Sequence, residues 1–119
     1  MTAKESRLVV KEEGGILQVS FLDRNILEEA YIQQIGDEIS SLIDEATNPK
    51  ILLSFSSVEH LSSAALGTLI TVNNKVRQKG GQLRLSDIDS QIYEVFVITK
   101  LNKLFQIHEN AEAALASFK

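Results

Sequence analysis

The sequence predicts an α/β protein with a mixed central sheet, in the order β-β-α-β-α-β-α-β-α. Two observations support this prediction. Short apolar runs alternate with longer segments in which apolar residues recur every three or four positions. In addition, two short strands come first, and every later strand is followed by a helix. A hairpin followed by strand–helix repeats implies a mixed sheet with crossover helices.

The first two strands are predicted in the segment RLVVKEEGGILQVSFL, residues 7–22. Leu8, Val9 and Val10 supply the first strand. In the second, Leu17, Val19 and Phe21 alternate with polar residues. The glycines at positions 14 and 15 permit positive φ angles, so we expect a hairpin turn there.

The clearest helix is predicted in residues 25–50, NILEEAYIQQIGDEISSLIDEATNPK. Asp23 or Asn25 is expected to cap its start. The pattern stops at Asn48-Pro49, because a residue before proline is disfavoured in the α region. Its apolar face is expected to consist of Ile32, Ile35, Ile39, Leu42 and Ala46.

The middle of the chain predicts two further strands around a helix. The continuous apolar run at 51–55, ILLSF, is typical of a strand that is covered on both faces. A helix is predicted from Ser63 to Lys79, ended by Gly80-Gly81, and a strand at 82–86 follows. The apolar stripe of this helix is Ala65, Leu69, Val72 and Val76.

The last third predicts a helix over Asp89–Leu101, an edge strand in residues 104–108 and a short final helix capped by Asn110. No linker or repeat interrupts the pattern, so residues 1–119 are expected to form one domain. The packed side of the first of these helices is expected to hold Ile88, Ile92, Val95, Phe96 and Thr99.

Composition narrows the possible functions. The 119 residues are 44% hydrophobic and 24% charged, with a formal net charge of −4 and no cysteine. The acidic balance argues against nucleic acid or a polybasic membrane anchor, and the lack of cysteine excludes thiol chemistry. No phosphate-loop or metal-ligand motif is present. We expect a cytoplasmic protein without cofactor, metal or membrane segment.

Two adjacent serines, Ser62 and Ser63, stand where a loop meets the second long helix. One interpretation is a helix N-cap, for which serine is favoured. The other is a phosphorylation site, because a helix N-terminus offers free N–H groups and a positive dipole end. Both roles are compatible with the same position. A third hypothesis is that Ser63 is a nucleophile with His60 as its base. The sequence offers no orienting group or oxyanion donors for such a site.

The chain resembles the STAS domain family, and within it the bacterial anti-sigma factor antagonists. Three segments carry the resemblance: VEHLSSAALGTLI (58–70), FLDRNIL (21–27) and the tail from Leu83 to Phe118. The first is similar to the family's Asp-Ser-Ser/Thr-Gly-Leu-Gly signature, with Ser62, Ala64 and Ala65 in place of Asp, Ser/Thr and Gly. The resemblance implies a STAS-type fold with helices mainly on one face of the sheet.

The resemblance also implies a non-enzymatic partner-switching role. An unphosphorylated antagonist binds an anti-sigma factor that is a serine kinase and so frees a sigma factor. Phosphorylation, here of Ser63 with Ser62 as a second candidate acceptor, releases it, and a serine phosphatase resets it. The implied phosphosite pocket is Asp23, Ser62 and Ala64. The implied partner surface is Asp23, His60, Ser63, Thr68, Thr71 and Asn74. The alternative is a scaffold subunit of a larger sensory or transporter-associated assembly.

Overall fold

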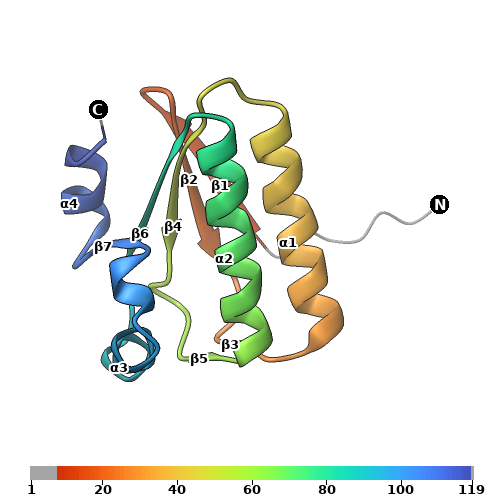
Figure 1. Cartoon of the computed structure of the whole chain (residues 1–119), viewed down its shortest axis with the longest axis vertical. Helices are drawn as coiled ribbons and strands as arrows, with labels where there is room; N and C mark the ends of the chain where they lie inside the picture. Colours follow the sequence, from red (N-terminus) through yellow and green to blue (C-terminus); the bar gives the residue numbers. More distant parts are fainter. Residues whose placement is uncertain (1–7, 119) are drawn as a thin grey trace.

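A five-stranded mixed sheet forms the centre of the computed structural model, which describes residues 8–118 (Figure 1). The strand order is β1-β2-β4-β6-β7. β1 is antiparallel to β2, and all other neighbours are parallel, so the predicted mixed sheet is confirmed. The strands are β1 (Leu8–Glu13), β2 (Ile16–Phe21), β4 (Lys50–Ser54), β6 (Gln82–Ser86) and β7 (Gln106–His108).

The hairpin between β1 and β2 turns where the sequence predicts it. Gly14 and Gly15 both have positive φ angles, 60° and 82°. This is the two-residue turn whose backbone twist matches that of the flanking antiparallel strands. A side chain at either position would be strained by the left-handed backbone, which explains why two glycines stand here.

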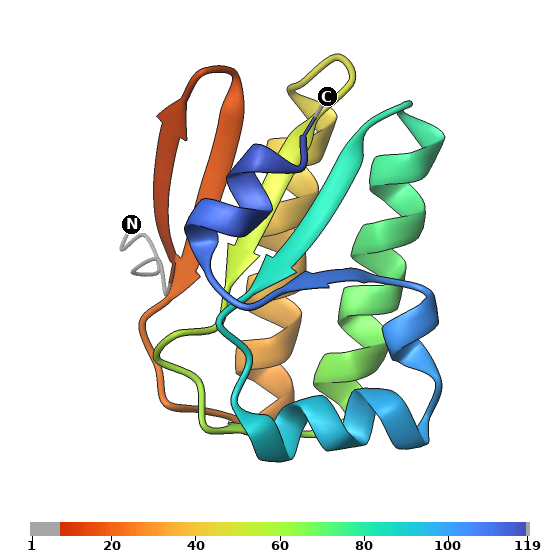
Figure 2. The ribbon, with the colours of Figure 1, turned by 90° about the vertical axis from the view of Figure 1, so that its left-hand side faces the viewer.

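Two long helices, α1 (Glu29–Asp44) and α2 (Ser63–Gln78), lie side by side on one face of the sheet (Figures 1 and 2). They approach closely at Gly36, where an added Cβ would lie 3.0 Å from Thr68 Cγ2. Glycine at this point therefore lets the helices pack. The buried residues are Ile32, Ile35, Ile39 and Ile43 on α1 and Ala65, Leu69, Val72, Asn73 and Val76 on α2.

The start and end of α1 differ from the prediction. The N-cap position is Glu28, which makes no side-chain cap hydrogen bond, so the predicted cap by Asp23 or Asn25 is wrong. Asn25 instead lies in β3 (Asn25–Ile26), which pairs with β5 (His60–Leu61). At the other end the helix stops at Asp44, so Ala46 lies beyond it and Ile43 provides the last buried contact.

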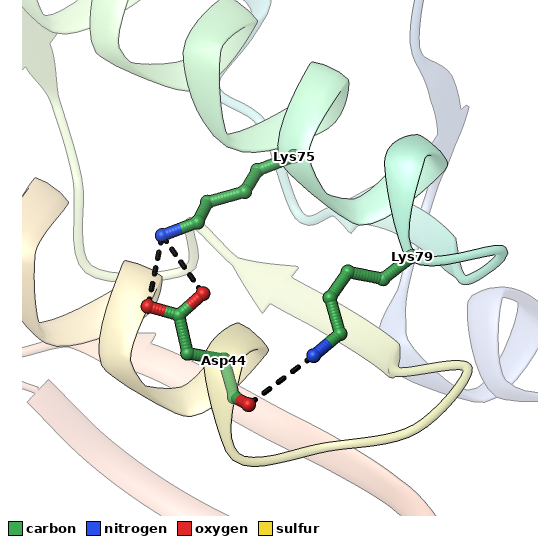
Figure 3. A network of polar contacts seen from close by, with 3 residues as sticks. All are labelled: Asp44, Lys75 and Lys79. Atoms are coloured by element: carbon green, nitrogen blue, oxygen red, sulfur yellow. Dashed lines mark hydrogen bonds and ion pairs between the residues drawn. The ribbon is translucent and has the colours of Figure 1, made fainter.

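An ion pair joins the carboxyl ends of the two long helices (Figure 3). Lys75 Nζ lies 3.0 Å from Asp44 Oδ1, and Lys79 Nζ donates to the Asp44 carbonyl oxygen at 3.2 Å. Both contacts are solvent-exposed, so each contributes little to stability. They do place cations beside the negative end of the α1 dipole.

The opposite face of the sheet is covered by the short helix α4 (Ala111–Ala116), which packs against β4, β6 and β7 (Figure 2). Arg84 on β6 is buried beneath it. Its Nε donates to Ser117 Oγ at 2.9 Å and one terminal nitrogen donates to Gln82 Oε1 at 3.0 Å. The Phe118 ring lies 5.0 Å from the guanidinium carbon. Burial of the guanidinium lowers the pKa of Arg84.

The helix α3 (Ser90–Ile98) lies across the carboxyl end of the sheet (Figures 1 and 2). Asp89 caps it, accepting from the Gln91 N–H at 2.8 Å. It is shorter than predicted, because Lys100 adopts a left-handed conformation and a 3₁₀ turn, η1 (Leu101–Lys103), follows. Ile92 and Phe96 are buried as predicted, but Val95 and Thr99 are exposed, so the predicted packed side was too wide.

Replacing Arg84 by alanine should lower the free energy of unfolding by about 1–3 kcal/mol, because buried acceptors lose their donor. Urea denaturation measures this change. The control Arg77→Ala removes an exposed arginine of α2 and should change stability by less than about 0.5 kcal/mol. Equal effects of the two substitutions would mean that the contacts of Arg84 add nothing to stability.

Candidate functional site

Two loops at the carboxyl end of the sheet are joined by main-chain hydrogen bonds. The first follows β2 and contains Asp23, and the second follows β4 and leads into α2. The Glu59 N–H donates to the Arg24 carbonyl at 2.7 Å, and the Ser62 N–H donates to the Ile26 carbonyl at 3.2 Å. Between these bonds, β3 and β5 pair in parallel. The turn that holds Asp23 is therefore held beside the turn that holds the two serines.

Ser62 is the N-cap of α2. Its backbone is extended, with φ −86° and ψ 167°, and its Oγ accepts a hydrogen bond from the Ala65 N–H at 3.2 Å. Its carbonyl accepts from the Leu66 N–H, also at 3.2 Å. The side chain is partly buried. The capping interpretation is thus correct for Ser62, whose hydroxyl is already engaged in holding the helix start.

Ser63 is the first residue of α2, and its side chain is exposed together with that of Ala64. The first helical N–H groups have no intrahelical acceptor, and the first turn contains no acidic residue. A positive dipole end therefore faces solvent beside the Ser63 hydroxyl. Ala65, where the resembled family has glycine, is helical and buried, so alanine fits there without backbone strain. The arrangement leaves room and favourable electrostatics for an anion on Ser63.

The remaining predicted contact residues are distributed unevenly along α2. Asn74 is exposed, and it lies on the same helical stripe as Ser63, about 16 Å along the axis. Thr71 is exposed, but its hydroxyl donates to the Gly67 carbonyl at 3.2 Å. Thr68 is partly buried where α2 packs against Gly36 of α1, against the expectation of an exposed contact.

His60 and Asp23 lie on the loops that precede the two long helices. His60 is exposed on β5, while Asp23 is partly buried in the turn after β2. Within residues 8–118, no hydrogen bond joins His60 to Ser63. The structure therefore brings the loops of Asp23, His60 and Ser63 together at one end, with Thr71 and Asn74 further along α2.

An open groove of about 580 Å³ lies beside this site, and sequence reasoning did not identify it. We call it the α3 groove, since α3 forms one wall and the β3–β5 pair forms the other. The apolar Leu27, in the loop after the Asp23 turn, lines the groove and was a signal that could have suggested it. The groove is lined by Asn25, Leu27, Glu59, His60, Leu61, Gln91, Ile92 and Val95.

Two other kinds of feature are absent from the described residues. Among the described residues, no group of three or more histidine, cysteine, aspartate or glutamate side chains is arranged to hold a metal ion. None of the helices between residues 8 and 118 has the length and apolar character needed to cross a membrane.

A family model described as the STAS domain matches residues 9–114. The chain belongs to the STAS domain family. The match covers nearly all of the described fold, so the family and fold predicted from the sequence resemblance are confirmed.

Known proteins similar to this STAS domain include a sequence relative and two solved structures. Over 96 residues the chain is 27% identical to BtrV of Bordetella bronchiseptica, named as an anti-sigma factor antagonist; the match covers 81% of this chain and 82% of BtrV. An anti-sigma-factor antagonist (STAS) domain protein from Planctomyces limnophilus has a TM-score of 0.82 at 20% identity, covering 95% and 98% of the two chains. Bacillus SpoIIAA in its phosphorylated form has a TM-score of 0.67 at 16% identity, covering 89% and 95%.

The two serines make a matched pair for testing the cap. Ser62→Ala should lower the free energy of unfolding by about 1 kcal/mol, because the Ala65 N–H loses its acceptor. Ser63→Ala should be nearly neutral, because alanine is favoured inside a helix. Urea denaturation of both variants checks this difference, and a larger loss from Ser63→Ala would reverse the assignment.

Proposed function

We propose that the chain is an anti-sigma factor antagonist whose binding is switched off by phosphorylation of Ser63. Its unphosphorylated form binds an anti-sigma factor that is also a serine kinase, and this frees a sigma factor. A serine phosphatase restores the binding form. The protein acts by binding and not as an enzyme.

One observation carries this proposal: the two serines at the start of α2 have different roles. Ser62 holds the helix through its hydroxyl, whereas Ser63 presents an exposed hydroxyl at the positive helix end. Phosphorylation of Ser62 would compete with the cap bond, so Ser63 is the better acceptor of the two. The names of BtrV and of the similar anti-sigma-factor antagonist structure from Planctomyces limnophilus support the same general role.

Phosphorylation of Ser63 would change the surface while leaving the fold in place. A phosphate there carries a charge of about −1.5 to −2. Free N–H groups and the helix dipole accommodate it locally, and Ala64 adds no bulk beside it. A partner that packs on the uncharged surface would have to desolvate this charge. The phosphate would therefore expel the partner without unfolding α2.

Capture from native-host lysate with four baits tests the proposal: wild type, Ser63→Ala, Ser63→Asp and Ser62→Asp. Wild type and Ser63→Ala should both retain an anti-sigma factor kinase, identified by mass spectrometry. Ser63→Asp should lose it, because the carboxylate mimics part of the phosphate charge. With ATP, the purified kinase should add one phosphate to wild type and none to Ser63→Ala.

Each other outcome has a definite meaning. Loss of the kinase from Ser62→Asp alone would move the acceptor to Ser62. Identical partners on all four baits would mean that the serines serve only the helix start. A very large complex in gel filtration of the native protein would then favour the alternative role as a scaffold subunit.

A further inference from the structure

The helix α3 has more apolar residues than it buries against the rest of the protein. Its sequence is SQIYEVFVI, and only Ile92 and Phe96 are buried. The exposed fraction of Ile98 is 79%, and large apolar side chains that remain exposed in a group commonly mark an interaction surface. The other exposed apolar residues of the helix are Tyr93, Val95 and Val97.

This apolar surface continues into the α3 groove. Val95, 42% exposed, lies on the α3 wall, and Leu27, 52% exposed, lies on the β3 side. His60 and Leu61 also line the groove, and they directly precede the serines of α2. Both ribbon views place α3 at the same end of the molecule as β3, β5 and the start of α2 (Figures 1 and 2). The groove is therefore continuous with the proposed Ser63 surface.

One acidic residue lines the groove, and two more are sequence neighbours of residues that line it. Glu59 lines the groove, Glu28 follows Leu27, and Glu94 precedes Val95, and all three are exposed. Arg24 is paired with Glu59 at 3.1 Å, so these two charges offset each other, and the excess negative charge next to the groove comes from Glu28 and Glu94. A complementary partner would present apolar side chains flanked by lysine or arginine.

We propose that the α3 groove and the exposed face of α3 form a second docking surface, which binds an apolar segment of the anti-sigma factor flanked by basic residues. This inference rests on the proposed function, and it adds a contact that does not involve Ser63. A single helix-start contact is small, whereas specific complexes usually bury a larger, mostly continuous patch. The groove extends the Ser63 surface toward the exposed apolar residues of α3.

A second copy of the chain fits this surface less well. A symmetric contact would bring the same patch of both copies face to face. Glu28 and Glu94 of one copy would then approach those of the other, and the net charge of −4 adds to this repulsion. The charge pattern therefore favours a basic partner over self-association.

The test uses two matched double variants of the full chain. Leu27→Ser with Val95→Ser removes apolar contacts from both walls of the groove. Val9→Ser with Val10→Ser is the control, because these valines are similarly exposed, 39% and 41%, but lie on edge strand β1. Binding to the purified anti-sigma factor, identified by its Ser63-dependent capture, is measured by calorimetry. Thermal unfolding confirms that both variants fold.

The groove variant should weaken binding about tenfold or more, as expected for apolar residues at an interface centre, while the control binds like wild type. Glu28→Gln with Glu94→Gln leaves the Arg24–Glu59 pair intact and should weaken binding and reduce its dependence on salt. Unchanged affinity of the groove variant would overturn this inference and leave the proposed function standing. Failure of wild type to bind any anti-sigma factor would overturn both. If wild type self-associates and the groove variant does not, the occupant of the groove is a second copy of the chain, and this inference is also overturned.

Discussion

Burial of β4 on both faces is the constraint on which the rest of the structure depends. Ile51, Leu52 and Leu53 are all fully buried, although successive side chains point to opposite sides of a strand. Each face of the sheet must therefore be covered. The helices α1 and α2 cover one face and α4 covers the other. Because β2, β4 and β6 are parallel, their carboxyl ends meet at one edge, where α/β proteins commonly place their binding sites.

The pairing of β3 with β5 turns that edge into a defined surface. Each strand is two residues long, so the pair adds few hydrogen bonds. Its effect is geometric, because it joins the loop after β2 to the loop after β4 and so sets the position of Ser62. Ile26 of β3 and Phe55 are both buried, and the Phe21 and Phe55 ring centroids lie 5.0 Å apart. The exposed polar residues of the site thus rest on a packed apolar base.

Much of the fold could be predicted from local pattern, because the residues that form the core also create the periodicity. The stripe of Ile32, Ile35 and Ile39 and the turn at Gly14-Gly15 are examples. The start of α1 could not, since the pairing of Asn25 with His60 joins residues far apart in sequence and leaves no periodic signal. The end of α3 was missed because the left-handed residue that follows it is Lys100 and not the glycine or asparagine that usually marks such an end. Its packed side was predicted too wide because apolar residues lie on all sides of the helix.

The candidate site was predictable in part for the same reason. Cap chemistry indicates a serine at the start of a helix, so the Ser62-Ser63 pair could be identified from the sequence. Which serine caps and which is exposed depends on the backbone conformation of Ser62. The α3 groove as a whole could not be predicted from the sequence, because Leu27, His60 and Val95 come from three separate segments. Only the tertiary fold brings them together.

The distribution of contacts along α2 explains how a change at Ser63 can alter binding without altering the fold. Its middle and its carboxyl half are held by Leu69, Val72 and Val76, which are buried in the core. Most of the free energy that holds the helix therefore comes from contacts beyond its first turn. The first turn contributes chiefly the Ser62 cap and an exposed positive dipole end. Charge added at Ser63 thus acts mainly on whatever approaches this end of the helix.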